Sequence, residues 1–134
     1  MKNNKKKVPL IYQIWEEGKY LDLWNIPHFL IGILIGFALI FFSVPLIYSL
    51  IIVFLIKLSW EIYEHINVIK ETIPNKILDI VTGLLGYLFI FYINNLRPIT
   101  LKDFFIVLAV ELFIGSWGLY SAKKLDNFIK SVKK

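Results

Sequence analysis

The sequence predicts an all-α, polytopic membrane protein with four transmembrane helices in a bundle and an N-terminal amphipathic interfacial helix. Of the 134 residues, 57% are hydrophobic, and the mean hydropathy of +0.66 is too high for a soluble domain of this size. Four apolar stretches approach the length of about 20 residues that a helix needs to cross a bilayer. Lysines gather at both ends of the chain, which is typical of segments that flank a membrane.

The first element is expected within residues 1–25, which form a basic N-terminus followed by an amphipathic helix from Val8 to Trp24. Apolar Ile11, Trp15 and Leu21 alternate with charged residues there, so the helix is expected to lie in the interface with its aromatic rings at headgroup depth. A soluble amphipathic helix packed on another domain is the alternative. Acidic residues interrupt the apolar stretch, so we expect no cleavable signal peptide.

The transmembrane domain is expected over residues 26–122, followed by a basic C-terminal tail over residues 123–134. Its spans are predicted from Ile26 to Phe42, Val44 to Trp60, Lys76 to Ile93 and Phe104 to Ala122. A tight turn around Pro45 joins the first two spans. The second connection is polar and ends at Asn75, a candidate helix cap, whereas residues 94–100 form a helix breaker that contains Pro98.

The distribution of positive charge predicts the orientation. With four spans, all basic residues except Lys57, Arg97 and Lys102 lie on the side that holds both termini. The positive-inside tendency therefore predicts cytoplasmic termini in the cytoplasmic membrane of a prokaryote. Since this distribution accounts for the net charge of +5, we expect no nucleic acid as a partner.

Polar residues recur where three of the predicted spans meet one membrane face. His28 opens the first span, Glu61 ends the second and Asp79 lies in the first turn of the third. Helical spacing places further polar residues beside them. The sequence therefore predicts a site with candidate catalytic residues His28, Glu61, Glu64, His65 and Asp79, and with candidate binding residues Trp60, Asn67, Asn75, Thr82 and Gly83.

Two kinds of chemistry are compatible with these residues, and a structural role is the alternative to both. Neighbouring carboxylates and imidazoles suit general acid/base catalysis. Glu61 and His65, one helical turn apart, are also able to ligate a divalent metal together with Asp79 and His28, although the pattern assigns no metal. Alternatively, the polar groups form a network that fixes the register of the helices.

Four further residues inside the spans have specific interpretations. Gly32 and Gly36 form a GxxxG pair on the face of His28 and predict close helix packing within the bundle, with homodimerisation as the alternative. Lys57 is expected to extend its ammonium to the nearby interface. Glu111, midway along the fourth span, is a candidate residue for a transport path.

The composition excludes several classes of enzyme. The chain has no cysteine, which excludes disulfides, thiolate metal sites and cysteine nucleophiles. The serines lack a nucleophile-elbow context and no glycine-rich phosphate loop is present, so serine hydrolase and phosphatase functions are not expected.

The motifs between about residues 22 and 92 resemble the VanZ-like superfamily of integral membrane proteins. The matching residues are His28-Phe29, the Glu61 and Glu64 pair, and Asn75 and Asp79 ahead of Gly83 and Gly86, while Trp24-Asn25 stands where the family has Asp-Lys. The named member of that family is associated with glycopeptide-antibiotic tolerance. The resemblance implies a role in the cell envelope and supplies no mechanism.

We therefore expect an envelope protein that binds or modifies a membrane lipid or a polar headgroup at its polar cluster. The first alternative is a non-catalytic bundle whose cluster fixes helix packing and whose partner is another membrane protein or a second copy of the chain. The second alternative is a small transporter that uses Glu111.

Overall fold

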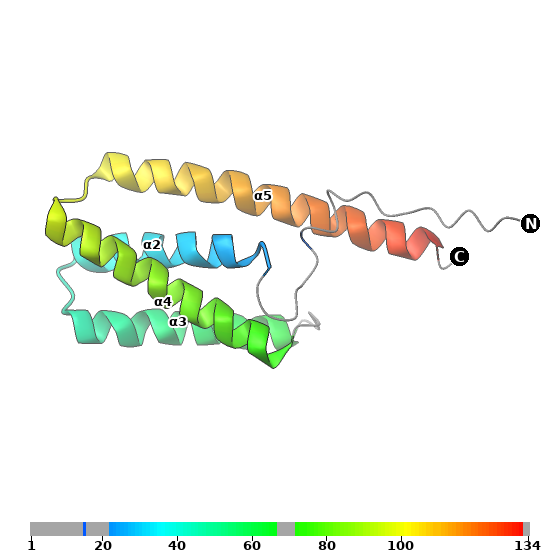
Figure 1. Cartoon of the computed structure of the whole chain (residues 1–134), viewed down its shortest axis with the longest axis horizontal. Coiled ribbons are helices and arrows are strands. Elements are labelled where there is room, and N and C mark those ends of the chain that lie inside the picture. Colours follow the sequence, from blue (N-terminus) through cyan, green and yellow to red (C-terminus); the bar gives the residue numbers. More distant parts are fainter. Residues whose placement is uncertain (1–14, 16–21, 67–71, 133–134) are drawn as a thin grey trace, which may run out of the picture.

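The computed structural model describes Trp15 and residues 22–66 and 72–132, and this part of the chain consists of helices joined by short turns, without strands. Its helices are α2 (Asn25–Phe41), α3 (Leu46–Ile66), α4 (Ile73–Leu96) and α5 (Leu101–Val132). The four helices run side by side along the long axis of the molecule, and α5 projects beyond the other three toward the C-terminus (Figure 1). The predicted all-α class is confirmed.

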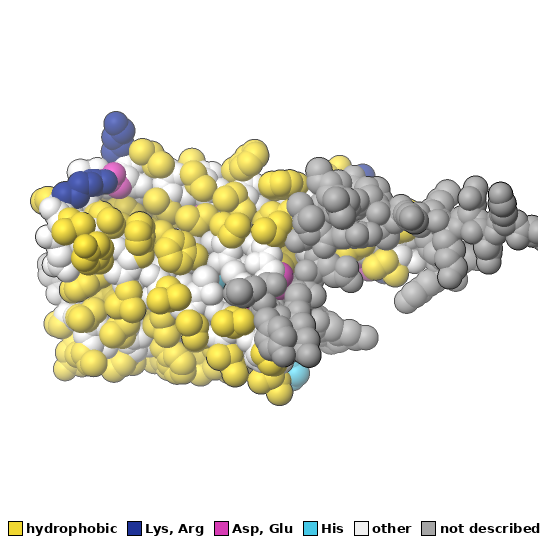
Figure 2. Space-filling view, in the orientation of Figure 1, with side chains coloured by type: hydrophobic (Ala, Val, Ile, Leu, Met, Phe, Trp, Pro, Cys, Tyr) yellow, Lys and Arg dark blue, Asp and Glu magenta, His cyan; other side chains and the backbone are white. Residues whose placement is uncertain are grey.

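Three of the helices, α3, α4 and α5, are long and apolar enough to cross a membrane. Hydrophobic side chains cover the visible face of the bundle along its length, and Lys and Arg side chains appear at the end where α4 joins α5 (Figure 2). Helix α2 is equally apolar but has 17 residues, a length of about 26 Å. These features indicate a membrane protein with at least three helices suited to span the bilayer.

The predicted hairpin between the first two spans is formed by a Schellman motif at the end of α2. The Ser43 amide donates to the Ile40 carbonyl and the Val44 amide to the Leu39 carbonyl, both at 2.9 Å. Ser43 has a φ of 53°, the left-handed conformation that this motif requires and that usually favours glycine. The chain therefore reverses direction within a few residues and starts α3 at Leu46.

Threonine caps begin the last two helices. Asn75 was the predicted cap of the third span, but the N-cap is Thr72, whose hydroxyl accepts a hydrogen bond from the Asn75 amide. In α5, Thr100 and Asp103 form a reciprocal capping box. Asp103 also binds the Arg97 guanidinium through two hydrogen bonds of 2.9 and 3.0 Å, which raise the pKa of Arg97.

Close packing between α2 and α4 depends on glycine. A methyl group at Gly32 would overlap the Gly83 carbonyl, and one at Gly86 would overlap the Phe29 carbonyl. Gly36 likewise lies against Tyr87 and Ile90 of α4. The predicted role of the GxxxG pair in packing within the bundle is therefore confirmed, and the backbones of the two helices approach directly.

Most of the predicted interfacial helix lies outside the described residues. Trp15 and the segment before α2 are described, and Trp15, Leu23 and Trp24 are in turns. Trp15 is 2% exposed and packs against Trp24, Trp117 and Gly118. This indole contacts α5, so the aromatic residues ahead of α2 attach that segment to the bundle.

Candidate functional site

Three helices bring polar side chains together in the interior at one end of the bundle. Asn25 and His28 lie in the first turn of α2, Asn75 and Asp79 in the first two turns of α4, and Lys57 and Glu61 near the end of α3. Each of these side chains is at most 8% exposed. We call them the polar cluster, defined as Asn25, His28, Lys57, Glu61, Asn75 and Asp79.

Asp79 of α4 is the centre of the cluster. The Asn25 side-chain amide donates a hydrogen bond to Oδ1 of Asp79. The Asn75 amide approaches Oδ2 at 3.4 Å. Nε2 of His28 lies 3.7 Å from Oδ1. Two side-chain amides thus donate to the carboxylate, one to each oxygen.

Lys57 of α3 reaches the imidazole of His28. Its Nζ is hydrogen-bonded to Nδ1 of His28. When Lys57 is an ammonium it donates this bond, which places the imidazole proton on Nε2, facing Asp79. The three side chains therefore form a chain from a cation through a neutral imidazole to an anion, and this chain links three helices.

The glycine at position 83 makes room for this lysine. A methyl group at Gly83 would lie 2.8 Å from Cδ of Lys57, so the aliphatic stem packs directly on the α4 backbone. Lys57 is 2% exposed. The expectation that it extends to the interface is wrong, because its stem packs on Gly83 and its Nζ is hydrogen-bonded to His28 inside the bundle.

Three side chains of the cluster also bring possible metal-ligand atoms close together. One ligand atom each from His28, Glu61 and Asp79 lies within 4.8 Å of the others. Nitrogen and oxygen ligands of this kind suit Zn²⁺ or Mn²⁺. The ammonium of Lys57 beside His28 opposes a second cation, so the cluster as it stands already contains its own positive charge.

The predicted site residues divide into two groups. His28, Glu61, Asn75, Asp79 and Gly83 come together in the interior, as expected. Glu64 is half-buried beside them.

The other predicted residues do not join the cluster. His65 is exposed in the last turn of α3, although it follows the buried Glu61 by one helical turn. Trp60 is 47% exposed and contacts Tyr63. The Thr82 hydroxyl donates to the Leu78 carbonyl of its own helix at 2.6 Å. Asn67 lies outside the described residues.

Two residues of the polar cluster, Lys57 and Asn25, were not among the predicted site residues. Lys57 precedes Glu61 by four positions and so shares its helix face, a signal that was present in the sequence. Asn25 precedes His28 by three positions in the same way. Helix periodicity does not show that Lys57 reaches His28 of α2 or that Asn25 reaches Asp79 of α4, because each contact joins two different helices.

Glu111 of α5 lies outside the group formed by His28, Glu61 and Asp79. It is half-buried, and it interacts with the cluster through the charge of Lys57. Its Oε1 would lie 3.5 Å from a methyl group at Gly115, an ordinary contact. Among the described residues, Lys57 forms its hydrogen bond with His28 and not with Glu111.

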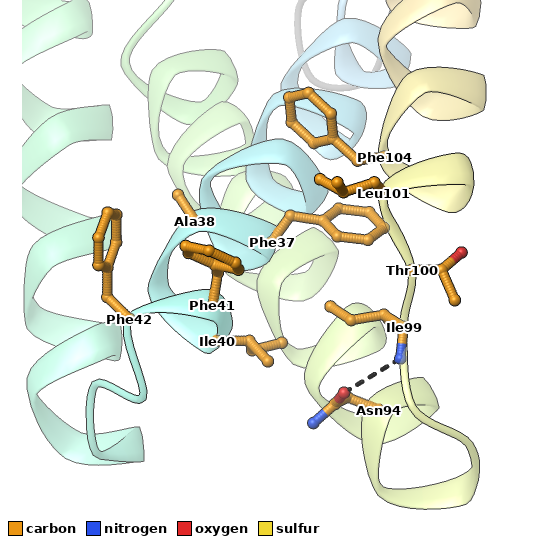
Figure 3. A pocket seen from close by; sticks show the side chains of 10 residues that line it. All are labelled: Phe37, Ala38, Ile40, Phe41, Phe42, Asn94, Ile99, Thr100, Leu101 and Phe104. Atoms are coloured by element: carbon orange, nitrogen blue, oxygen red, sulfur yellow. Dashed lines mark hydrogen bonds between the residues drawn. The ribbon is translucent and has the colours of Figure 1, made fainter.

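Two concave regions differ in their relation to the cluster. A groove of about 610 Å³ between α2 and α3 includes Lys57 in its lining. A cavity of about 440 Å³ lies at the opposite end, where Phe37, Phe41 and Phe104 are among its lining residues (Figure 3). The polar lining residues there are Asn94, which accepts a hydrogen bond from the Ile99 amide, and Thr100. None of the described residues that line this cavity is ionisable.

Comparisons of the chain with protein-family models, curated proteins and solved structures give no match. The function must therefore be argued from the geometry of the polar cluster.

Proposed function

We propose that this protein is an integral membrane protein that binds or modifies the polar headgroup of a membrane lipid at the polar cluster. One observation supports this most strongly. The side chains of His28, Glu61 and Asp79 come from three different helices and meet in the interior, with Lys57 bound to the imidazole. Acid, base and cation are thus gathered at the end of an apolar bundle.

A purely stabilising role does not explain so many ionisable groups. Removing charges from water costs several kcal/mol for each ion, so a buried ion pair is often no better for stability than well-packed apolar residues. Amides such as Asn25 and Asn75 would connect the helices at lower cost. Ionisable residues buried within membrane helices are instead typical of binding and proton-transfer sites.

The hydrogen bonds suggest different roles for the residues. Asp79, held by two amides, orients His28 and keeps its proton on Nε2. His28 and Glu61 are the groups suited to exchange protons with a bound headgroup. Glu64, half-buried next to this group, is placed to contact a headgroup that enters.

The membrane arrangement is part of the same proposal. Helix α2 is the fourth span, since about 26 Å is near the roughly 30 Å thickness of the hydrocarbon core. Both termini are cytoplasmic, as the distribution of lysines indicates. The resemblance of the His28, Glu61 and Asp79 motifs to VanZ-like proteins supports placing the protein in the cell envelope.

A second candidate role is a structural network that fixes the helices in register. The observation in its favour is that Asn25, Asn75 and Lys57 already provide hydrogen bonds to Asp79 and His28. In this role the cluster has no ligand, and the partner is another membrane protein or a second copy of the chain.

Native mass spectrometry of protein released from lipid nanodiscs distinguishes the two roles. We expect His28→Gln and Glu61→Gln to lose bound lipid while the folded yield is retained. His65→Gln is the matched control, because this second histidine is exposed on α3. Lipid retention equal to wild type in His28→Gln, together with a lower thermal stability, would support the structural role instead.

A further inference from the structure

A membrane-facing groove lies between α2 and α3 and leads to the polar cluster. Ile31 lines it from α2, and Leu55, Ile56 and Trp60 are among its lining residues on α3. Lys57 is also part of the lining, so the groove of about 610 Å³ and the cluster share this residue. The apolar walls are typical of a surface that contacts an acyl chain.

The ammonium of Lys57 has hydrogen-bonding capacity to spare. It carries three N–H donors, and among the described residues its one hydrogen bond is to Nδ1 of His28. Its aliphatic stem is packed on Gly83, which fixes the position of Nζ between the helices. An acceptor that enters along the groove would therefore meet an oriented donor.

The chemistry around Lys57 limits what that acceptor can be. Lys57 is hydrogen-bonded to His28, which lies beside the carboxylates of Glu61 and Asp79, and these carboxylates would repel an anion such as a phosphate. The apolar walls would also make an anion costly to bury. A neutral carbonyl oxygen avoids both penalties and still satisfies an N–H of the ammonium.

The position of the aromatic pair fits a lipid as the occupant. Trp60 and Tyr63 line the groove at the end nearest the cluster, and their ring centroids are 5.6 Å apart. Both side chains are about half exposed, and such rings are enriched where lipid headgroups meet the hydrocarbon core. Ester carbonyls of glycerolipids are located at that same depth.

We propose that the α2–α3 groove binds one acyl chain of a bilayer glycerolipid, with the ester carbonyl of that chain accepting a hydrogen bond from Lys57. This inference rests on the proposed function and names its substrate class as ester-linked glycerolipids. The lipid enters sideways from the bilayer, so that the ester carbonyl, and not the phosphate, is the group that reaches Lys57. No covalent step is part of the inference.

Photocrosslinking in nanodiscs tests the position of the acyl chain. The probe is phosphatidylcholine with a diazirine in one acyl chain, and peptide mass spectrometry locates the adducts. We expect adducts concentrated at Ile31, Leu55 and Ile56, and a yield about tenfold lower when Ile31→Trp fills the groove. The matched control is Ile47→Trp, which adds the same bulk at an exposed position of α3 outside the groove. Adducts spread evenly over the exposed residues of α3 would overturn the inference.

Competition between lipids tests the carbonyl. Diester phosphatidylcholine should displace the probe from the wild-type groove at about tenfold lower concentration than the diether analogue. In Lys57→Met this preference should disappear, while the wild-type comparison remains decisive if the variant fails to fold. Equal competition by both lipids in the wild type would overturn the role of Lys57. If the groove adducts persist while His28→Gln retains its lipid in native mass spectrometry, the result supports acyl-chain binding in the groove and contradicts the proposed headgroup site.

Discussion

The substitution Asp79→Asn tests the hydrogen bonding at the centre of the polar cluster. Asn has nearly the same shape as Asp but replaces one acceptor oxygen with an NH₂ donor. In the wild type, Oδ1 accepts from Asn25 and Oδ2 from Asn75, so either orientation of a new amide places two donors against each other. We therefore expect a large loss of stability from a change of very few atoms.

The size of the effect follows from the bonds that are lost. A hydrogen bond to a charged group contributes about 1.5–3 kcal/mol, and a buried donor left without an acceptor costs about 1–3 kcal/mol more. Asp79 is 1% exposed, so little of this cost is relieved by solvent. The free energy of unfolding should fall by about 3–5 kcal/mol.

A double-mutant cycle isolates the contact itself. Unfolding is followed by circular dichroism in mixed micelles with increasing sodium dodecyl sulfate, for Asp79→Asn, Asn25→Ala and the double variant. Because Asn25→Ala removes the donor that opposes the new amide, the two effects should deviate from additivity by about 1–2 kcal/mol. Asp126→Asn is the control, since its pair with Lys130 is exposed and should contribute below about 0.5 kcal/mol.

Two outcomes would refute this reasoning. A loss from Asp79→Asn as small as that of the Asp126 control would mean that the carboxylate is solvated. Additivity within about 0.5 kcal/mol would mean that Asn25 and Asp79 do not interact.

Three further predictions concern packing, the turn and metal binding. Gly32→Ala should lower the free energy of unfolding by about 1–3 kcal/mol, because its methyl group overlaps the Gly83 carbonyl. The control Gly115→Ala makes ordinary contacts only, so it should leave the free energy of unfolding unchanged or raise it by up to about 1 kcal/mol. A larger loss from Gly115→Ala than from Gly32→Ala in the same unfolding assay would contradict the α2–α4 packing. Ser43→Gly should raise stability by about 1 kcal/mol, since glycine adopts a positive φ without strain, and a loss would show that the turn has another conformation. Added Zn²⁺ should raise the melting temperature of Lys57→Met more than that of wild type, because removing the ammonium leaves His28, Glu61 and Asp79 without their cation. A larger rise in the melting temperature of the wild type would show that the ammonium does not oppose a metal.

The helices were predictable because their signals are local. Apolar stretches, Pro45 and Pro98 predicted four helices. Most of the predicted helix ends lie within a few residues of the observed ones. The beginning of the third predicted span was less accurate, since both Thr72 and Asn75 are able to cap a helix and only the backbone conformation decides between them. The structure extends the last helix to Val132, beyond the predicted apolar span, because charged residues continue a helix outside the apolar layer.

The site was predictable in outline only. His28, Glu61 and Asp79 were identified because the topology of hairpins places them at one end of the bundle. Which side chains complete the cluster depends on the contacts between helices, and the periodicity of one helix does not predict those contacts. Lys57 lies in the interior because its stem packs on Gly83 of α4 and its Nζ binds His28 of α2, whereas His65 is exposed in the last turn of α3.

Solid-state nuclear magnetic resonance in lipid bilayers tests the central claim most directly. In a His65→Gln background the His28 ring is the sole imidazole, and dipolar recoupling measures its proximity to labelled Lys and Asp side chains. We predict dephasing of Nδ1 by the Lys57 side chain and of Nε2 by the Asp79 carboxyl group. An imidazole that couples to neither would contradict the convergence of the three helices on one buried cluster.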